Sequence, residues 1–149
     1  MSASPSAPLR LAGYAALFRQ RDAGRDIIRP GAFARTLANR TGPLPLLWQH
    51  RPDRRIGWVE SLAEDKRGLR VVARLDTADG GAALTLRAGK VTGLSFGYAA
   101  RRFRREPQGR ELLDIDLFEI SLVTTPMQHL ARVHLISPLP QRPVAGQFS

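Results

Sequence analysis

The sequence predicts a mainly β fold (α+β), in which six to seven antiparallel strands form a closed or nearly closed barrel with two short helices packed on it. Two observations predict this class. Short apolar or alternating segments recur along the chain between turn residues, and only two segments have helical spacing. The chain has 149 residues, 43% of them hydrophobic, which suffices for one domain with a sizeable core.

The first half of the chain contains four predicted strands and one helix. The helix is predicted because Phe33 and Leu37 are four residues apart and share a helical face. A short apolar strand ends at His50, and we expect residues 51–53 to form the turn after it. A charged loop that ends in Gly68 joins the arms of the clearest hairpin. In order, these elements cover residues 9–18 (strand), 31–39 (helix), 46–50 (strand), 56–63 and 68–75 (hairpin).

The second half contains one helix and three strands. Residues 76–79 offer N-cap side chains for the helix, and Gly89 is a suitable residue to end it. Two long strands are joined by a hairpin turn through residues 106–110, and Pro126 ends the second strand. These elements cover residues 80–88 (helix), 91–103, 112–124 and 132–136 (strands).

Both ends of the chain have compositions typical of tails. Residues 1–8 are rich in Ser, Ala and Pro and are expected to be disordered, and residues 138–149 are rich in Pro and Gln. Residues 9–137 are then a single predicted domain. No stretch approaches the roughly 20 apolar residues of a membrane span, and the N-terminus lacks the pattern of a secretory signal. We therefore expect a cytoplasmic or particle-internal protein without membrane contact.

The composition excludes several kinds of chemistry. The chain has no cysteine, which excludes disulfides, thiolate catalysis and cysteine-based metal sites. The three histidines, at positions 50, 129 and 134, form neither a His-x3-His nor a His-Glu-x-x-His pattern. We therefore expect no metal and no cofactor.

The charge balance points to several kinds of partner. The formal net charge is +10, and of the 23 basic side chains 21 are arginines and two are lysines. This enrichment fits a GC-rich genome, an acidic protein partner or proximity to nucleic acid. Within residues 101–105 an aromatic side chain, Phe103, stands among four arginines. The segment could be a phosphate stripe with a stacking residue or a solvated strand end, and no recognised DNA-reading motif accompanies it.

Three polar residues each interrupt a run that otherwise has the pattern of a buried strand. They are His50 after Leu-Leu-Trp-Gln, Ser95 in Gly-Leu-Ser-Phe-Gly-Tyr, and Glu119 in Leu-Phe-Glu-Ile-Ser-Leu-Val. Buried polar side chains are costly unless they are paired, and these three could pair with one another. A hydroxyl, an imidazole and a carboxylate in contact are the parts of a nucleophilic hydrolase.

Ser95 lies on a strand face with very little side-chain bulk. By alternation, Ser95 shares this face with Gly93, Gly97 and Ala99, so a substrate backbone could approach the hydroxyl closely. The two glycines are therefore candidate substrate-binding residues. The alternative is that these small residues let a neighbouring element of the same chain pack tightly.

Glu119 and His50 also have structural alternatives. Alternation places residues 115, 117, 119, 121 and 123 on one face of their strand, and both faces of its last part are mainly apolar. A carboxylate buried there needs a cation or several donors, which His50 or one of the many arginines could supply. A lone histidine at the end of a strand is commonly structural. His129 and His134 lie in an expected loop and at an expected surface position, which makes them weaker candidates for a catalytic base.

A set of short sequence motifs indicates a resemblance to a known family. They are Gly13-Tyr14-Ala15, Ile27-Ile28-Arg29-Pro30-Gly31-Ala32-Phe33, Leu46-Leu47-Trp48-Gln49-His50, Ile56-Gly57, Gly93-Leu94-Ser95-Phe96-Gly97-Tyr98 and Glu119-Ile120-Ser121-Leu122-Val123-Thr124-Thr125-Pro126. In this order they cover roughly residues 9–136, and the chain resembles the prohead maturation proteases of tailed bacteriophages and gene transfer agents. These are serine peptidases whose barrel resembles the herpesvirus capsid-assembly protease.

The resemblance implies a function and a role for each of the three residues. Ser95 would be the nucleophile, His50 the general base and then the general acid, and Glu119 the third member. The implied substrates are the major capsid protein with its scaffold segment, and the protease itself, cleaved inside the assembling procapsid. A homodimer would match the herpesvirus relatives. One departure is Met127-Gln128, where the family commonly has Ala-Asn. The alternative functions are a non-enzymatic nucleic-acid-binding module and a capsid-internal structural protein.

Overall fold

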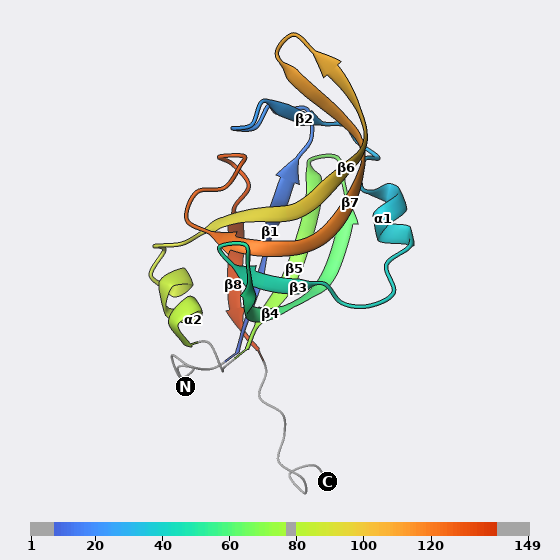
Figure 1. Cartoon of the computed structure of the whole chain (residues 1–149). Coiled ribbons are helices and arrows are strands. Elements are labelled where there is room, and N and C mark those ends of the chain that lie inside the picture. Colours follow the sequence, from blue (N-terminus) through green and yellow to red (C-terminus); the bar gives the residue numbers. More distant parts are fainter. Residues whose placement is uncertain (1–7, 77–79, 140–149) are drawn as a thin grey trace, which may run out of the picture.

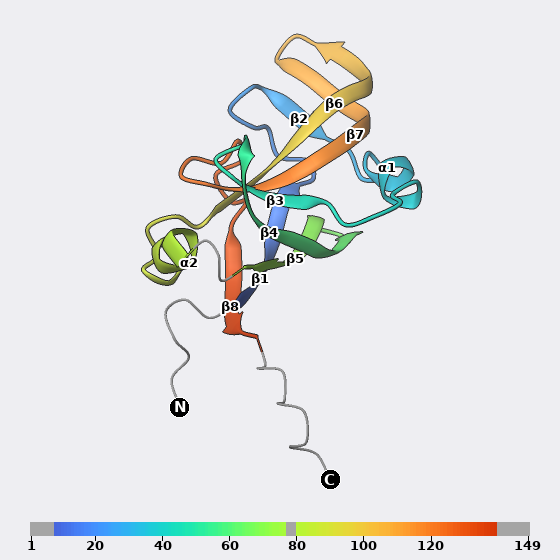
Figure 2. The same ribbon diagram turned by 60° about the horizontal axis from the view of Figure 1, so that its bottom comes forward.

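The computed structural model describes residues 8–76 and 80–139, which form eight strands and two helices. The chain is therefore mainly β, as predicted. The elements are β1 (Leu9–Leu17), β2 (Asp26–Ile28), α1 (Ala34–Ala38), β3 (Pro45–Trp48), β4 (Arg51–Glu64), β5 (Gly68–Leu75), α2 (Gly80–Arg87), β6 (Gly93–Glu106), β7 (Gly109–Val123) and β8 (Val133–Pro138). The two helices lie on opposite sides of the molecule (Figures 1 and 2).

All the strands belong to one sheet in the order β2-β7-β3-β4-β5-β1-β8, and β6 pairs with β7 outside this path. The short strands β2 and β3 run parallel to β7, and the other pairs are antiparallel. The sheet curls strongly, and the far end of the β6–β7 hairpin projects beyond its body (Figure 1).

The prediction of a closed or nearly closed barrel is not confirmed, because the sheet is open. Its outer strands β6 and β8 meet where the chain leads into them, through an isolated bridge between Gly93 and Arg132. Beyond this bridge β6 turns to follow β7 and β8 follows β1, so no continuous ladder joins the two strands. The edge of β6 from Ser95 to Glu106 thus carries no neighbouring strand among the described residues.

The core lies inside the curled sheet. Inward side chains from strands far apart in the sequence are fully buried together, among them Leu11, Ile56, Leu75, Leu94 and Ile120. Phe33, which precedes α1, packs edge-on against Phe96 of β6 with 5.3 Å between ring centroids. This contact anchors the core-facing side of β6 and β7. The polar residues lie on the opposite, outer face of these two strands.

Two local predictions are wrong. Residues 51–53 do not form a turn, because they already belong to β4, and the turn consists of Gln49 and His50 instead. Strand β2 was not predicted, since three residues are too few to show an alternation. It is held by parallel pairing to β7 and by the buried Asp26, which accepts two hydrogen bonds from Arg110 at 3.0 and 2.7 Å.

The strict alternation predicted for β7 also fails. Gly97 of β6 is opposite Glu119, but the next residue, Tyr98, is opposite Leu117, so Phe118 is an extra residue that forms a β-bulge. The bulge reverses the alternation. Leu117 and Ile120 both face the core, while Glu119 turns to the outer face.

Other predictions agree with the structure or lie outside its described part. Helix α2 ends before Gly89, which has a positive φ of 70°, as expected for a C-terminal glycine. The predicted N-cap residues 77–79 and the outer parts of both predicted tails lie outside the described residues. No described helix has the length and hydropathy of a membrane span.

Candidate active site

The three predicted residues meet around the last part of β7, which lies between β6 on one side and β3 on the other. Ser121 of β7 is opposite Ser95 of β6 and also beside Leu47 of β3. The turn after β3 then carries His50 back toward β7. Three segments that are distant in sequence therefore supply neighbouring side chains because β7 pairs along both of its edges.

His50 and Glu119 are in direct contact. The Nδ1 atom of the imidazole lies 2.5 Å from Oε1 of the carboxylate, whose side chain is only 12% exposed, against 41% for the histidine. The hydrogen bond to Glu119 and its negative charge raise the pKa of His50 above the usual value, against the opposing effect of burial. The carboxylate therefore holds the ring in one orientation and stabilises its protonated form.

Ser121 is a functional candidate that sequence reasoning did not single out. Its side chain is fully buried, its hydroxyl donates to Oε2 of Glu119 at 2.6 Å, and it accepts a hydrogen bond from the backbone N–H of His50 at 3.1 Å. Ser121 thus links the carboxylate to the histidine turn. The signal was available in the sequence, since Ser121 is the other polar residue in the apolar end of this strand and lies two positions after Glu119.

Gln49 fixes the other half of the turn. Its backbone N–H donates to the carbonyl of Leu122 at 3.0 Å, and its side-chain amide donates to Oγ1 of Thr124 at 2.6 Å. The amide oxygen accepts from the N–H of Thr124 at 3.1 Å. These bonds hold Gln49 and His50 at φ values of 52° and 59°, which residues other than glycine adopt at a cost. Such a strained backbone conformation persists where several surrounding contacts hold it in place.

Ser95 lies beside this cluster without a direct hydrogen bond to His50 among the described residues. It is 3% exposed, and direct cross-strand partners such as Ser95 and Ser121 have Cβ atoms about 4.5–5.5 Å apart on the same face of a sheet. The Oε1 atom of Glu119 lies against the position that a Cβ of Gly97 would occupy. Because the same oxygen binds His50, the imidazole is held close to Gly97, two residues along β6 from Ser95.

The two glycines predicted to bind substrate are crowded by the chain itself. A Cβ at Gly97 would collide with the side chain of Glu119, and one at Gly93 would lie 2.7 Å from the carbonyl of Val123 and 2.8 Å from the ring of Pro126. Their lack of a side chain thus lets the site assemble. A role for Gly93 and Gly97 in substrate binding stays a prediction.

The loop after β7 is fixed by Gln128, one of the two residues that depart from the family pattern. This buried side chain accepts from the N–H of Leu17 at 2.6 Å and donates to the carbonyls of Leu17 and Gln20 at 2.8 and 3.0 Å. All three contacts are to the backbone at and beyond the end of β1. A glutamine therefore secures this loop beside β6, where Leu94 donates to the carbonyl of Ala131 at 2.9 Å.

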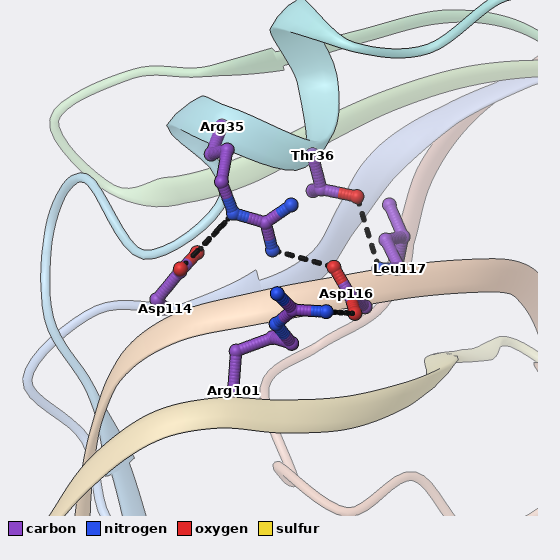
Figure 3. A network of polar contacts seen from close by, with 6 residues as sticks. All are labelled: Arg35, Thr36, Arg101, Asp114, Asp116 and Leu117. Carbon is purple, nitrogen blue, oxygen red and sulfur yellow. Dashed lines mark hydrogen bonds and ion pairs between the residues drawn. The ribbon is translucent and has the colours of Figure 1, made fainter.

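An ion-pair network joins α1 to β6 and β7 (Figure 3). Arg35 of α1 binds Asp114 at 3.0 Å and Asp116 at 2.5 Å, and Arg101 of β6 binds the other oxygen of Asp116 at 3.3 Å. These contacts hold the pKa of Asp116 below its usual value and hold α1 against β7. Thr36 on the same helix accepts a backbone hydrogen bond from β7.

This network bears on the alternative interpretation of Glu119 as half of an arginine–glutamate bridge. Arg35 and Arg101 pair with Asp116, whereas Glu119 pairs with His50 and Ser121. No arginine among the described residues forms an ion pair with Glu119.

In residues 8–76 and 80–139 no group of three His, Asp or Glu side chains converges as a metal site.

Solved structures of two viral proteases share the fold of this chain. The structure of the varicella-zoster virus protease superposes with a TM-score of 0.58 at 21% identity, over 85% of this chain and 63% of that one. The capsid assembly protease of bacteriophage T4 superposes with a TM-score of 0.59 at 12% identity, over 76% and 80% of the two chains. At these identities the likeness shows the fold.

The chain belongs to the caudovirus prohead serine protease family, whose model matches residues 2–139. The prohead protease of Enterobacteria phage HK97 is 36% identical over 128 residues, which cover 81% of this chain and 57% of that protein. The chain thus spans less than two thirds of this relative. The resemblance to prohead proteases that was inferred from the short sequence motifs is confirmed.

Proposed function

We propose that the protein is a serine endopeptidase that cleaves capsid and scaffold proteins during prohead maturation of a tailed phage or gene transfer agent. Membership of the prohead serine protease family and the likeness to the HK97 prohead protease support this function. The observation that carries it is the shared contact of Glu119, whose Oε1 atom binds His50 while lying against Gly97, two residues from Ser95.

The chemistry follows from the orientation of the imidazole. His50 directs its Nδ1–H to Glu119, so Nε2 is the nitrogen that takes the proton from the Ser95 hydroxyl. The Ser95 oxygen attacks the substrate carbonyl, and the protonated imidazole then gives its proton to the leaving amine. Water, deprotonated by the same nitrogen, hydrolyses the acyl-enzyme and regenerates the hydroxyl of Ser95.

Ser95 is a better nucleophile than its neighbour Ser121. The Ser121 hydroxyl already donates to Glu119 and accepts from His50, and the residue is fully buried. Its proton is therefore committed to a structural bond. Ser95 carries no competing hydrogen bond among the described residues, so its hydroxyl is available to the imidazole.

The carboxylate has two roles in this mechanism. It fixes the tautomer of His50 and stabilises the imidazolium that forms when Ser95 attacks, which agrees with the raised pKa of His50. Ser121 and Gln49 are positioning residues, since they hold the carboxylate and the turn rather than the reacting atoms.

The open edge of β6 supports binding of an extended substrate. From Ser95 to Glu106 this edge carries no strand in the described part of the chain, so a substrate strand could add to it and pass the Ser95 hydroxyl. Gly93 and Gly97 would flank the scissile bond. We propose the major capsid protein, its scaffold segment and the protease itself as substrates, inside the assembling procapsid, with a homodimer as the relevant assembly.

The test is co-expression of the protease with the major capsid protein of the same phage, read by intact mass. Wild-type protease should trim the capsid protein, and Ser95→Ala should leave it at full length while keeping its own fold by circular dichroism. Ser61→Ala, an exposed serine on β4, is the matched control and should trim normally. Normal trimming by Ser95→Ala would reject the assignment of the nucleophile.

A further inference from the structure

A second surface of the molecule has the chemistry of a docking site. Between β2 and the projecting part of the β6–β7 hairpin lies a groove of about 690 Å³, which we call the arginine groove. Four arginines line it, together with one carboxylate: Arg19, Arg29, Arg102, Arg104 and Glu111. We propose that the arginine groove binds an acidic, extended segment of the protein substrate, a proposal that rests on the proposed protease function.

The arginines of the groove are largely unneutralised. Glu111 lies 3.2 Å from Arg29, and among the described residues no carboxylate pairs with Arg19, Arg102 or Arg104. All four arginine side chains are exposed. Some arginines elsewhere do pair with acids, as Arg35 does with Asp114 and Asp116. The groove therefore concentrates part of the +10 net charge at one place, where an anionic partner would supply the missing carboxylates.

The shape of the groove favours an extended peptide. Its wall includes the half-buried apolar side chains Ile27 and Leu113, which can contact aliphatic side chains of a ligand. Arg102 and Arg104 lie on the same side of β6, about 6–7 Å apart, the spacing of alternate residues in a strand. Carboxylates at alternate positions of an extended segment match this spacing, with apolar residues between them.

Nucleic acid fits the same surface less well. The aromatic residue of the basic stretch, Phe103, does not line the groove. Its ring contacts the guanidinium groups of Arg105 and Arg110, which lie 5.5 and 5.0 Å from the ring centroid. Base stacking on Phe103 would have to displace these cations, so the groove offers phosphate contacts without a stacking platform.

The groove is remote from the proposed catalytic residues but continuous with the edge that would bind substrate. Ser95 and Arg102 are seven residues apart on β6, which corresponds to about 20 Å along a strand. A segment held in the groove would raise the local concentration of a scissile bond further along the same polypeptide. The groove should thus determine affinity for whole substrates without changing the chemical step.

The experiment measures binding of a defined probe to the full chain carrying Ser95→Ala. The probe is a fluorescein-labelled 12-residue peptide of alternating glutamate and valine, followed by anisotropy at 50 and 300 mM salt. The groove variants are Arg102→Gln/Arg104→Gln on β6 and, on the opposite wall, Arg19→Gln. The control Lys66→Gln/Arg87→Gln loses the same charge as the double variant at exposed positions of the β4–β5 loop and α2.

We expect the Arg102→Gln/Arg104→Gln protein to bind the peptide at least about tenfold more weakly, and Arg19→Gln to show a smaller loss. The Lys66→Gln/Arg87→Gln protein should bind as the parent does, and binding should weaken at the higher salt concentration. Equal affinity of the parent, groove and control proteins would overturn the proposal. Tighter groove-dependent binding of a 20-nucleotide single-stranded DNA than of the peptide would replace the acidic peptide with nucleic acid.

A separate measurement distinguishes failure of the groove from failure of the protease function. A fluorophosphonate probe should label Ser95 in the wild-type protein and equally in Arg102→Gln/Arg104→Gln, because the groove does not touch the reacting atoms. Absence of labelling in both proteins would reject the serine protease while leaving the peptide measurement intact. Labelling with unchanged peptide affinity in the groove variants would reject the groove alone.

Discussion

The turn at Gln49 and His50 differs from the arginine groove in how its polar groups are partnered. In the turn, backbone and side-chain groups of both residues bond to β7, and the carboxylate of Glu119 is held by His50 and Ser121. In the groove, Arg19, Arg102 and Arg104 have no acidic partner among the described residues. The chain itself supplies the partners of the polar groups in the turn. In the groove, by our proposal, a bound acidic segment supplies the partners of the arginines.

This difference predicts which quantity each region controls. Fixed geometry is needed where atoms react, since small displacements lower the rate strongly. Unpaired surface charge instead contributes to association and is weakened by salt. Substitutions in the turn and its contacts should therefore lower kcat, whereas substitutions in the groove should change affinity for whole substrates.

The largest effect is expected from His50→Ala. Removal of the imidazole leaves no group to take the proton from Ser95, so the rate of peptide cleavage should fall by at least about 10³-fold. Cleavage of the co-expressed capsid protein and labelling by a fluorophosphonate should both be lost. If His50→Ala cleaves within tenfold of wild type, the turn is a structural element and the comparison of the two regions fails.

Glu119→Gln should have the next largest effect, roughly 10²–10³-fold on kcat. Because Glu119 raises the pKa of His50, wild-type activity should rise as pH increases through a value above the ordinary histidine pKa, where the base becomes neutral. In Glu119→Gln this acidic limb should move to lower pH. A pH profile of kcat measures the shift, and an unmoved limb would contradict the role of Glu119 on His50.

The sequence singles out the three candidate residues of this region but does not show how the chain holds them. Ser95, His50 and Glu119 are found because each places a polar group inside an apolar run, which is unfavourable unless the groups are paired. The short sequence motifs also identify the family. Neither signal shows how the groups are held, since this depends on the pairing of β7 with β3 and β6.

Two features could not be predicted from local patterns. The bulge at Phe118 reverses the alternation that strand periodicity assumes, and nothing in a run of apolar residues marks where an extra residue is inserted. The turn at Gln49 and His50 lacks the glycine or asparagine that normally indicates positive φ, so local preference favours a turn at Arg51-Pro52-Asp53. In both places long-range hydrogen bonds override the local preference.

Ser121→Ala tests how far the support of the turn matters for catalysis. It removes the hydroxyl between Glu119 and the backbone of His50, leaving two partly buried polar groups with fewer partners. We expect kcat to fall about tenfold and the free energy of unfolding to fall by about 1–3 kcal/mol. Ser61→Ala, exposed on β4, should change neither quantity. Loss of stability with unchanged kcat would make Ser121 a structural residue only.

The smallest effect is expected at Gln49, where two substitutions separate the side-chain clamp from the backbone conformation. Gln49→Ala and Gln49→Gly both lose the bonds to Thr124, so both should lower kcat by about three- to tenfold. Glycine adopts a φ of 52° readily and alanine does not, so Gln49→Gly should be about 1 kcal/mol more stable than Gln49→Ala in urea unfolding. Wild-type kcat in both variants would show that the clamp maintains the fold without positioning His50, and the turn would then resemble the groove in being dispensable to the chemical step.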